Sequence, residues 1–376
     1  MVDRQRRGFS ALLVSLLEHK YSNDPPRNSF GDAPFLVPGD FSRCNPAYFD
    51  HAAWVIDQAA KHGQLVLLAV SYIGCCGDDG WYAEMVSSGY ENLRGYGRFL
   101  ATRFSHLKNI VWVHGGDGNP ADPAVVREIA LGIREVDLTG LHTAHTAPGY
   151  QALDVYGDPP WLDVNNIYTY DPVRPIALRA YGRPDARPFF LLESEYEGEN
   201  RRAPLVRIRS QAWQSVLSGA MGQVFGNNPI WHFASTRPIT PFRSGWQDAL
   251  GSEGARSMSQ LRRLFAQLSW WELTPSIDDG FLMGWPYTGH YDAVAAYATS
   301  GNFAVVYVPQ PRQVRLDLRR GAMGVTRMRW YDPVSGLFDA ATALQMPRDL
   351  LLRVIPPRWV NAGGDRDWVL VLDSAS

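Results

Sequence analysis

Short apolar runs alternate with amphipathic stretches over the first two thirds of the chain. The runs lie at 9–17, 64–72, 109–115, 142–146, 164–170, 189–195 and 222–225. Stretches between them, such as 47–62, 89–104, 124–136 and 204–219, have the one-sided polarity of surface helices. Continuous apolar runs alternating with helices are typical of a parallel sheet covered on its outside, and this many units favour a barrel over an open sheet.

The predicted fold class is therefore α/β, a (β/α)8 barrel of the TIM type. A closed barrel needs one more strand and helix at its start, and only eight residues precede Phe9. We therefore expect a barrel whose first β/α unit is absent from this chain.

The pattern changes after Trp270-Trp271 and the turn-rich stretch 274–280. Short runs at 304–308, 314–318, 328–331 and 368–372 are separated by turns, one of them at 332–336, where proline and glycine set the backbone. This predicts a small antiparallel β-sandwich. The expected domains are a barrel at 1–272 and a β-sandwich at 273–376.

Composition narrows the function classes. The 36 basic and 38 acidic side chains give a formal net charge of −2, which argues against a nucleic-acid partner. No apolar run reaches the ~18 residues of a membrane span, so no membrane partner is expected. The apolar run 9–17 follows a charged start, as in a signal peptide, but Glu18 stands where a small residue would be needed for cleavage. We interpret the run as a buried strand, and the sequence does not fix the compartment.

Two of the apolar runs end in acids. Asp117 follows the run 109–115 and a pair of glycines, which let the backbone turn and approach a ligand closely. The run from Phe189 ends in Glu193, Glu195 and Glu197, at alternate positions. Active sites of parallel barrels lie at the carboxyl ends of the strands, so these acids are the first candidates. For any single one, a helix cap or an ion pair is an equally good interpretation.

If the absent strand is counted as the first, Asp117 ends the fourth strand and Glu193 follows the seventh, at opposite sides of the barrel mouth. Cleavage of a glycosidic bond needs such a pair of carboxyl groups. One protonates the leaving oxygen, and the other attacks the sugar carbon or activates water. A separation of ~5–5.5 Å leads to retention of configuration and ~6.5–9.5 Å to inversion.

Several segments together resemble the apiosidase-like glycosidases, the proteins around glycoside hydrolase family 140. They lie at 72–85, 109–117, 161–166, 193–197, 226–233 and 364–372, the last in a C-terminal module usually labelled a collagen-binding domain. The resemblance implies Asp117 as acid/base and Glu193 as nucleophile, with Tyr196 and Glu197 completing a Glu-x-x-Tyr-Glu pattern. It also implies retention of configuration and, because related enzymes are exported, an extracellular or periplasmic location. Family members begin with a further strand that this chain does not contain.

Other residues near the strand ends are candidates for binding the sugar. Aromatic rings stack on the apolar faces of sugars, histidines bind hydroxyl groups or tune a carboxylate, and amides donate hydrogen bonds. For each candidate, core packing or a turn role is the alternative. The predicted substrate-binding residues are Trp81, His114, Asn119, His145, Tyr168, Tyr170, Glu197, Asn227, Trp231 and His232, and Asn165 is a further source of amide hydrogen bonds.

Missing motifs exclude several classes. The chain has no Gly-x-Gly-x-x-Gly and no Gly-x-Ser-x-Gly, which argues against dehydrogenases and esterases. No His-x-His occurs, so no metal and no cofactor are expected. The sequence predicts a glycosidase whose partner is an oligo- or polysaccharide of plant or bacterial origin.

Two alternatives stay open. A non-catalytic carbohydrate-binding protein could be built on a degenerate barrel, and the C-terminal domain could adhere to matrix protein rather than brace the barrel. The sugar, the linkage and the oligomeric state are not fixed by the sequence.

Overall fold

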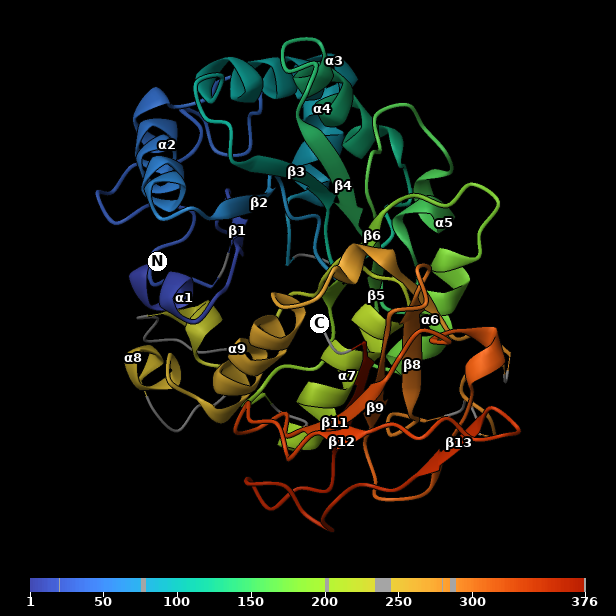
Figure 1. Ribbon diagram of the computed structural model, residues 1–376. Coiled ribbons are helices and arrows are strands. Elements are labelled where there is room, and N and C mark those ends of the chain that lie inside the picture. The colour runs from blue at the N-terminus through green and yellow to red at the C-terminus, as the bar shows by residue number, and fades with distance from the viewer. Residues whose placement is uncertain are drawn as a thin grey trace. The chain divides into compact units, whose positions relative to one another are not determined.

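The computed structural model (Figure 1) describes residues 1–19, 21–75, 79–199, 203–233, 245–278, 280–284 and 289–374. The chain divides into two compact units. The first consists of Met1–Tyr168 and Pro229–Trp246, and the second of Thr169–Asn228 and Gln247–Ser376. This division cuts through the predicted first domain, so the boundary at residue 272 stays a prediction.

The first unit contains a four-stranded parallel sheet (Figure 1) whose strand order follows the chain. Leu13 pairs with Leu67, Leu67 with Val111, and Val111 with Leu141. All four strands fall within or overlap the predicted apolar runs, and the parallel pairing confirms the expected α/β class. The strands are β1 (Ala11–Ser15), β2 (Leu65–Ala69), β3 (Ile110–Gly115) and β4 (Leu141–His145).

Helices separate these strands, as the polar-faced stretches predicted. They are α1 (Val2–Arg6), α2 (Pro46–Lys61), α3 (Tyr82–Arg103), α4 (Ala124–Arg134) and α5 (Ala152–Tyr156). Asn45 caps α2 by accepting from the N–H of Ala47, and Pro46 begins the helix at a position that needs no N–H donor. Gly97 of α3 and Gly132 of α4 let these two helices pack backbone to backbone, because a Cβ at either would meet main-chain atoms of the other helix.

The next two strands are β5 (Asn165–Tyr168) and β6 (Phe189–Glu193), which form a two-stranded sheet. The run predicted as a strand at 222–225 is instead an extended segment beside β6. Leu191 donates its N–H to the carbonyl of Gly222 (3.1 Å) and accepts from the N–H of Val224 (2.8 Å), in parallel sense. Closure into an eight-stranded barrel is not seen among the strand pairs of the described residues and stays a prediction.

The second unit holds the remaining helices. They are α6 (Val173–Tyr181), α7 (Leu205–Leu217), α8 (Trp246–Ala249), which begins at the last residue of the first unit, and α9 (Glu253–Phe265). Short 3-10 helices lie at Ile230–His232, Trp270–Glu272 and Leu318–Arg320, the first of them in the first unit. Ser252 caps α9 by accepting from the N–H of Ala255.

The C-terminal region is antiparallel, as predicted. A six-stranded sheet has the order β12-β11-β14-β9-β8-β7, and β10 pairs with β13 in a second sheet (Figure 1). The strands are β7 (Leu273–Pro275), β8 (Val294–Ala298), β9 (Phe303–Val308), β10 (Val314–Asp317), β11 (Arg327–Tyr331), β12 (Thr342–Ala343), β13 (Leu351–Val354) and β14 (Trp368–Asp373).

Both faces of the larger sheet are buried within the second unit. On one face, residues such as Val306 and Leu370 share a core with Leu316 of β10 and Leu352 of β13. On the other face, Tyr307 and its neighbours share a core with Trp213 of α7 and Phe265 of α9. Because side chains alternate along a strand, every residue of β9 and β14 is buried on one face or the other.

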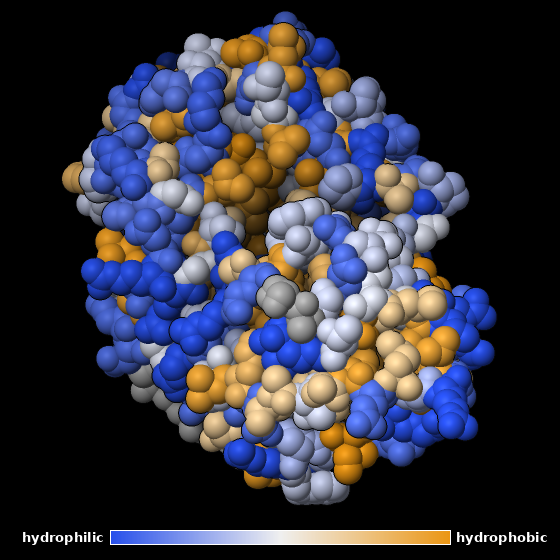
Figure 2. Space-filling model, in the orientation of Figure 1, coloured by the Kyte–Doolittle hydropathy of each residue, from blue (hydrophilic) through white to orange (hydrophobic). Residues whose placement is uncertain are grey.

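Within the described residues, no helix combines the length and the apolar character needed to cross a membrane. Figure 2 shows hydrophilic residues over much of the face that it draws, with hydrophobic residues between them, some singly and some gathered in groups. Among the exposed large hydrophobic side chains are two tryptophans of the second unit, Trp271 and Trp359.

Candidate active site

Asp117 stands on a loop that glycine brings against neighbouring backbone. Gly115 has a φ of +77°, and a Cβ there would lie 2.5 Å from the carbonyl oxygen of His145. A Cβ on Gly116 would lie 2.7 Å from the backbone nitrogen of Ile73, and the Gly116 N–H donates to the same His145 carbonyl at 3.3 Å. The glycine pair predicted to allow a close approach therefore fixes Asp117 between the ends of β2 and β4.

Two tyrosines that the sequence analysis missed lie in the electrostatic field of Asp117. Tyr21 and Tyr72 are hydrogen-bonded to each other through their side chains. Burial raises the pKa of both hydroxyl groups, and the negative charge of Asp117 raises it further. Both phenols therefore keep their protons at neutral pH and remain hydrogen-bond donors beside this carboxyl group.

His145 ends β4 and is 9% exposed. Its ring centroid lies 5.1 Å from that of Tyr168 on β5. Tyr21 also makes an edge-to-face contact with Trp231, with ring centroids 5.3 Å apart. These rings give the surroundings of Asp117 an aromatic character that suits a sugar ligand.

Glu193 is the last residue of β6 and is partly exposed. The hydroxyl group of Tyr170 donates to its Oε1 atom at 3.2 Å. Its main-chain carbonyl accepts from the N–H of Thr169 at 3.2 Å. Both the backbone and the carboxylate of Glu193 are thus held by the segment that follows β5.

Glu195 is buried and forms an ion pair within the second unit. Its Oε1 atom lies 2.5 Å from Nη2 of Arg207, and its main-chain carbonyl accepts from Nε2 of Gln211 at 2.7 Å. The same Nη2 atom donates to the carbonyl of Tyr170 at 3.1 Å. Arg207 therefore ties Glu195 to the tyrosine whose hydroxyl group reaches Glu193.

Glu197 has a third set of partners. Its Oε2 atom accepts from Oγ of Ser252 (2.6 Å) and Nδ2 of Asn227 (2.9 Å), and its Oε1 atom accepts from the N–H of Gly254 (3.0 Å). Ser252 and Gly254 belong to the amino-terminal end of α9, where a carboxylate is favoured by unpaired N–H groups and the helix dipole. The carboxylate of Glu197 therefore attaches the segment that follows β6 to the amino-terminal end of α9.

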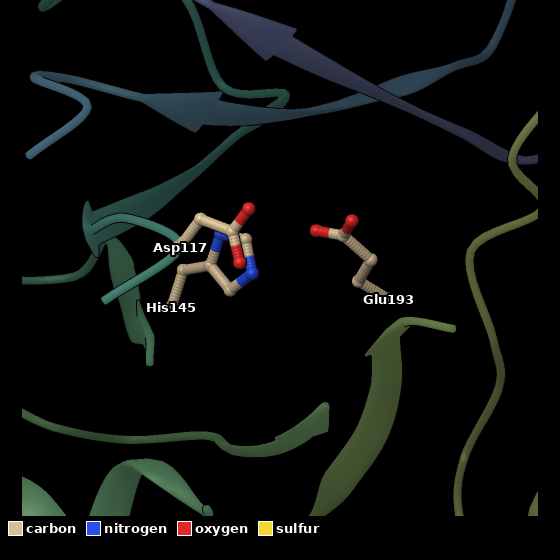
Figure 3. Close-up of side chains that lie close together, drawn as sticks. All are labelled: Asp117, His145 and Glu193. Carbon is tan, nitrogen blue, oxygen red and sulfur yellow. The ribbon is translucent and has the colours of Figure 1, made fainter. Parts of the chain in front are cut away.

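Figure 3 shows Asp117, His145 and Glu193 together. One ligand atom from each side chain lies within 4.8 Å of the others. Asp117 and His145 belong to the first unit and Glu193 to the second. A histidine and two carboxylates are side chains of the types that bind metal ions. The expectation of a metal-free site stays a prediction.

Comparisons with known proteins decide the family. A family model described as "Apiosidase-like, catalytic domain" matches residues 1–272, most of the chain. The chain belongs to the apiosidase-like glycosidases. A second model, described as "Putative collagen-binding domain of a collagenase", matches residues 284–373 of this glycosidase.

Solved structures share the fold of this apiosidase-like chain. A protein described as a glycoside hydrolase is 20% identical, with a TM-score of 0.83 over 100% of this chain and 87% of its own. A glycoside hydrolase family 5 protein from Bacteroides vulgatus is also 20% identical, with a TM-score of 0.82 over 99% of this chain and 84% of its own. Another Bacteroides vulgatus protein, described as a putative glycoside hydrolase, is 15% identical, with a TM-score of 0.70 over 100% and 74% of the two chains. Among curated proteins, none matches.

Two of the predicted sugar-binding residues of this glycosidase lie in its interior. Trp81 is 4% exposed and packs edge to face against Phe35 and Phe41. His114 is fully buried, with Nε2 2.9 Å from Nδ1 of His142. Burial lowers the pKa of His114 to about 3, so its ring is neutral in the folded protein. These contacts support packing roles, the alternative that the sequence left open.

Several other predicted residues have structural partners. Tyr168 is 1% exposed, and Asn165 is fully buried, with its amide donating to Oε1 of Gln151 at 3.0 Å. Asn119 is exposed and accepts from the N–H of Ala147 at 3.0 Å, which fixes the loop after β3. Asn227 donates to Glu197, as described above.

Trp231 contacts Tyr21, whereas the side chain of His232 lies outside the described part of the chain. Tyr72 gave a weak signal in the sequence, since it ends an apolar run, whereas no pattern marks Tyr21.

Proposed function

We propose that this glycosidase cleaves a glycosidic bond of a plant or bacterial polysaccharide with retention of configuration, using Asp117 as acid/base and Glu193 as nucleophile. The observation that carries the proposal is the place of the two acids in a chain of the apiosidase-like family: Asp117 follows β3, and Glu193 is the last residue of β6. The proposal requires a separation of ~5–5.5 Å between the two carboxyl groups, as in retaining glycosidases, whereas inverting ones leave room for a water molecule. The proposal includes a barrel of the (β/α)8 type, as the order of the apolar runs predicts.

In the first step, a carboxylate oxygen of Glu193 attacks the anomeric carbon of the sugar. The bond from that carbon to the leaving oxygen breaks, and this oxygen takes the proton of Asp117. In the second step, Asp117 removes a proton from water, and the water oxygen attacks the same carbon. Glu193 leaves as a carboxylate, and Asp117 is protonated again.

The neighbours of the two acids suit these roles. The hydroxyl group of Tyr170 donates to Glu193, which stabilises an ionised carboxylate and orients it. Tyr21 and Tyr72 lie in the field of Asp117 and keep their protons, so their hydroxyl groups can donate hydrogen bonds to a sugar bound there.

The test uses purified protein with pectic and arabinogalactan oligosaccharides and mass detection of the products. On the substrate that the protein hydrolyses, Glu193→Gln should lower kcat by about 10⁴ or more, and Asp117→Asn by ~10²–10⁴. Glu253→Gln removes an exposed carboxylate on α9 and serves as the matched control.

Azide separates the two roles. Added azide should restore the turnover of the Asp117→Ala variant and give a glycosyl azide of retained configuration. With the Glu193→Ala variant, it should give a glycosyl azide of inverted configuration. Near-native kcat in Glu193→Gln would refute the nucleophile. Binding of oligosaccharides without any product from the parent protein would favour the non-catalytic alternative.

A further inference from the structure

The second unit contains a cavity that the proposed reaction does not use. Its volume is about 530 Å³, within the range of ~300–1,000 Å³ for small-ligand sites and larger than a single sugar ring needs. The beginning of α7, the turn between β9 and β10, and the segment before β14 form its walls. The side chains that matter for recognition are Tyr291, Gln310, Arg312, Trp359, Asp365 and Arg366.

One wall presents an aromatic ring together with a cation. Trp359 is 62% exposed, which is unusual for so large an apolar side chain. The guanidinium carbon of Arg366 lies 5.2 Å from the centroid of its ring. The guanidinium group of Arg366 therefore lies over one face of the Trp359 ring, so that a planar hydrogen-bond donor adjoins a flat apolar surface.

The segment that carries these two residues is held in shape. The side-chain oxygen of Asn361 accepts from the N–H groups of Gly363 (3.0 Å) and Asp365 (3.1 Å), and its amide donates to Asp367 (2.8 Å). Asp367 is fully buried and pairs with Arg209 of α7. A wall built on such a turn loses little conformational entropy when a ligand binds.

The opposite wall is also stiff, because Pro309 and Pro311 fix the backbone on both sides of Gln310. Arg312 follows and adds a second arginine to the lining. The one acid in the lining, Asp365, lies 2.5 Å from Nη2 of the buried Arg209, which it shares with Asp367. The lining thus contains two arginines and one acid, so the formal charge of its side chains is positive.

We infer that this cavity is a second saccharide site and that it binds acidic sugars, the uronate units of an oligosaccharide. The apolar face of a uronate ring stacks on Trp359, and its carboxylate accepts the paired donors of an arginine. A neutral sugar would use the ring but would not gain from the charge of Arg366. The inference concerns binding only and needs neither Asp117 nor Glu193.

Calorimetry with an oligogalacturonate tests it, on the full chain carrying Glu193→Gln to prevent turnover. Adding Trp359→Ala should weaken binding about tenfold or more, and Arg366→Gln by a similar factor. Trp271→Ala, which removes another exposed tryptophan, should leave the affinity unchanged. The methyl-esterified oligosaccharide has the same rings without the charge and should bind about tenfold more weakly.

Three results would overturn the inference. Equal affinity of the Trp359→Ala variant would move the binding elsewhere, and equal affinity for the esterified form would remove the acidic specificity. A proline-rich triple-helical peptide that binds through Trp359, with no binding of the saccharide, would assign the cavity to collagen-like protein. In the chain with Glu193 intact, Trp359→Ala should hydrolyse short substrates at the parent rate, so a failure here is distinct from a failure of the proposed reaction.

Discussion

The two strand ends that carry the proposed catalytic acids are built in opposite ways. After β3, two glycines press the backbone against His145 and Ile73, and the loop supplies one acid, Asp117. After β6, the chain supplies three acids at alternate positions. The first of these, Glu193, accepts a hydrogen bond from the hydroxyl group of Tyr170.

The other two acids of this segment anchor it. Glu195 pairs with Arg207 on α7, and Glu197 accepts from the first residues of α9. One strand end is therefore fixed by close backbone contact and the other by charge. A cluster of acids after a strand is thus no measure of how many take part in chemistry.

The largest loss of stability is expected after β3, where close backbone contact holds the loop that carries Asp117. Gly115→Ala places a Cβ 2.5 Å from the His145 carbonyl at a positive φ, and should lower the free energy of unfolding by ~3 kcal/mol. Gly149→Ala is the matched control, because its φ is +86° but nothing lies within 4 Å of the added Cβ. It should lose only ~1 kcal/mol. Equal losses in urea unfolding would contradict the close-contact account.

The dependence of stability on pH tests the two buried histidines near the end of β3, His114 and His142. Burial lowers the pKa of both His114 and His142, so below the ordinary value of ~6.5 the unfolded chain takes up protons that the folded chain does not. Stability is fully present above that pH and should fall, by at most ~1.4 kcal/mol per pH unit for each histidine, as the pH drops toward 3. Unfolding measured between neutral and mildly acidic pH should show a shallower slope for His142→Gln. An unchanged slope would mean that this ring does not stay neutral.

Charged side chains hold the segment after β6, so removing one of these charges tests how that segment is held. Arg207→Met leaves the buried Glu195 carboxylate without its cation and should cost ~2 kcal/mol of stability, less than a fully buried pair because Arg207 is partly exposed. It should also lower kcat with little change in KM, since Tyr170 loses its support. Combining it with Glu195→Gln should recover part of the stability. An unchanged kcat would separate this ion pair from the nucleophile.

The smallest effect concerns Glu197. In the parent protein, three donors share the two carboxylate oxygens of Glu197. Glu197→Gln leaves them one acceptor oxygen, so about 1 kcal/mol of stability should be lost while turnover persists. Ser252→Ala, which also removes the α9 cap, should cost a similar amount. Loss of turnover as severe as that of Glu193→Gln, with stability intact, would give Glu197 a direct part in the reaction.

The sequence could predict the strands because a strand buried on both faces is a continuous apolar run. Such a run can be recognised without knowing which strands pair with it. Asp117 and Glu193 stood out because each follows such a run. The partners of Glu197 could not be found this way, since Ser252 lies 55 positions further along the chain. Only the fold brings the two together.

Position near a strand end was a poor guide to exposure. Trp81 and His114 lie close to strand ends in sequence, yet neighbouring side chains cover both completely or nearly so. Which way a ring faces depends on what packs over it, and that is set by segments distant in sequence. Tyr21 follows the first strand through a loop whose path no periodicity reveals.

The double burial of the C-terminal sheet has a consequence for how this protein can be divided. Trp213 and Phe265 belong to the segment matched by the catalytic family model, yet they share a core with Tyr307 of the sheet. A gene cut after Glu272 would encode a fragment whose large aromatic side chains meet water. Such a fragment should aggregate or be degraded, so evolution and protein engineering alike must inherit both parts together.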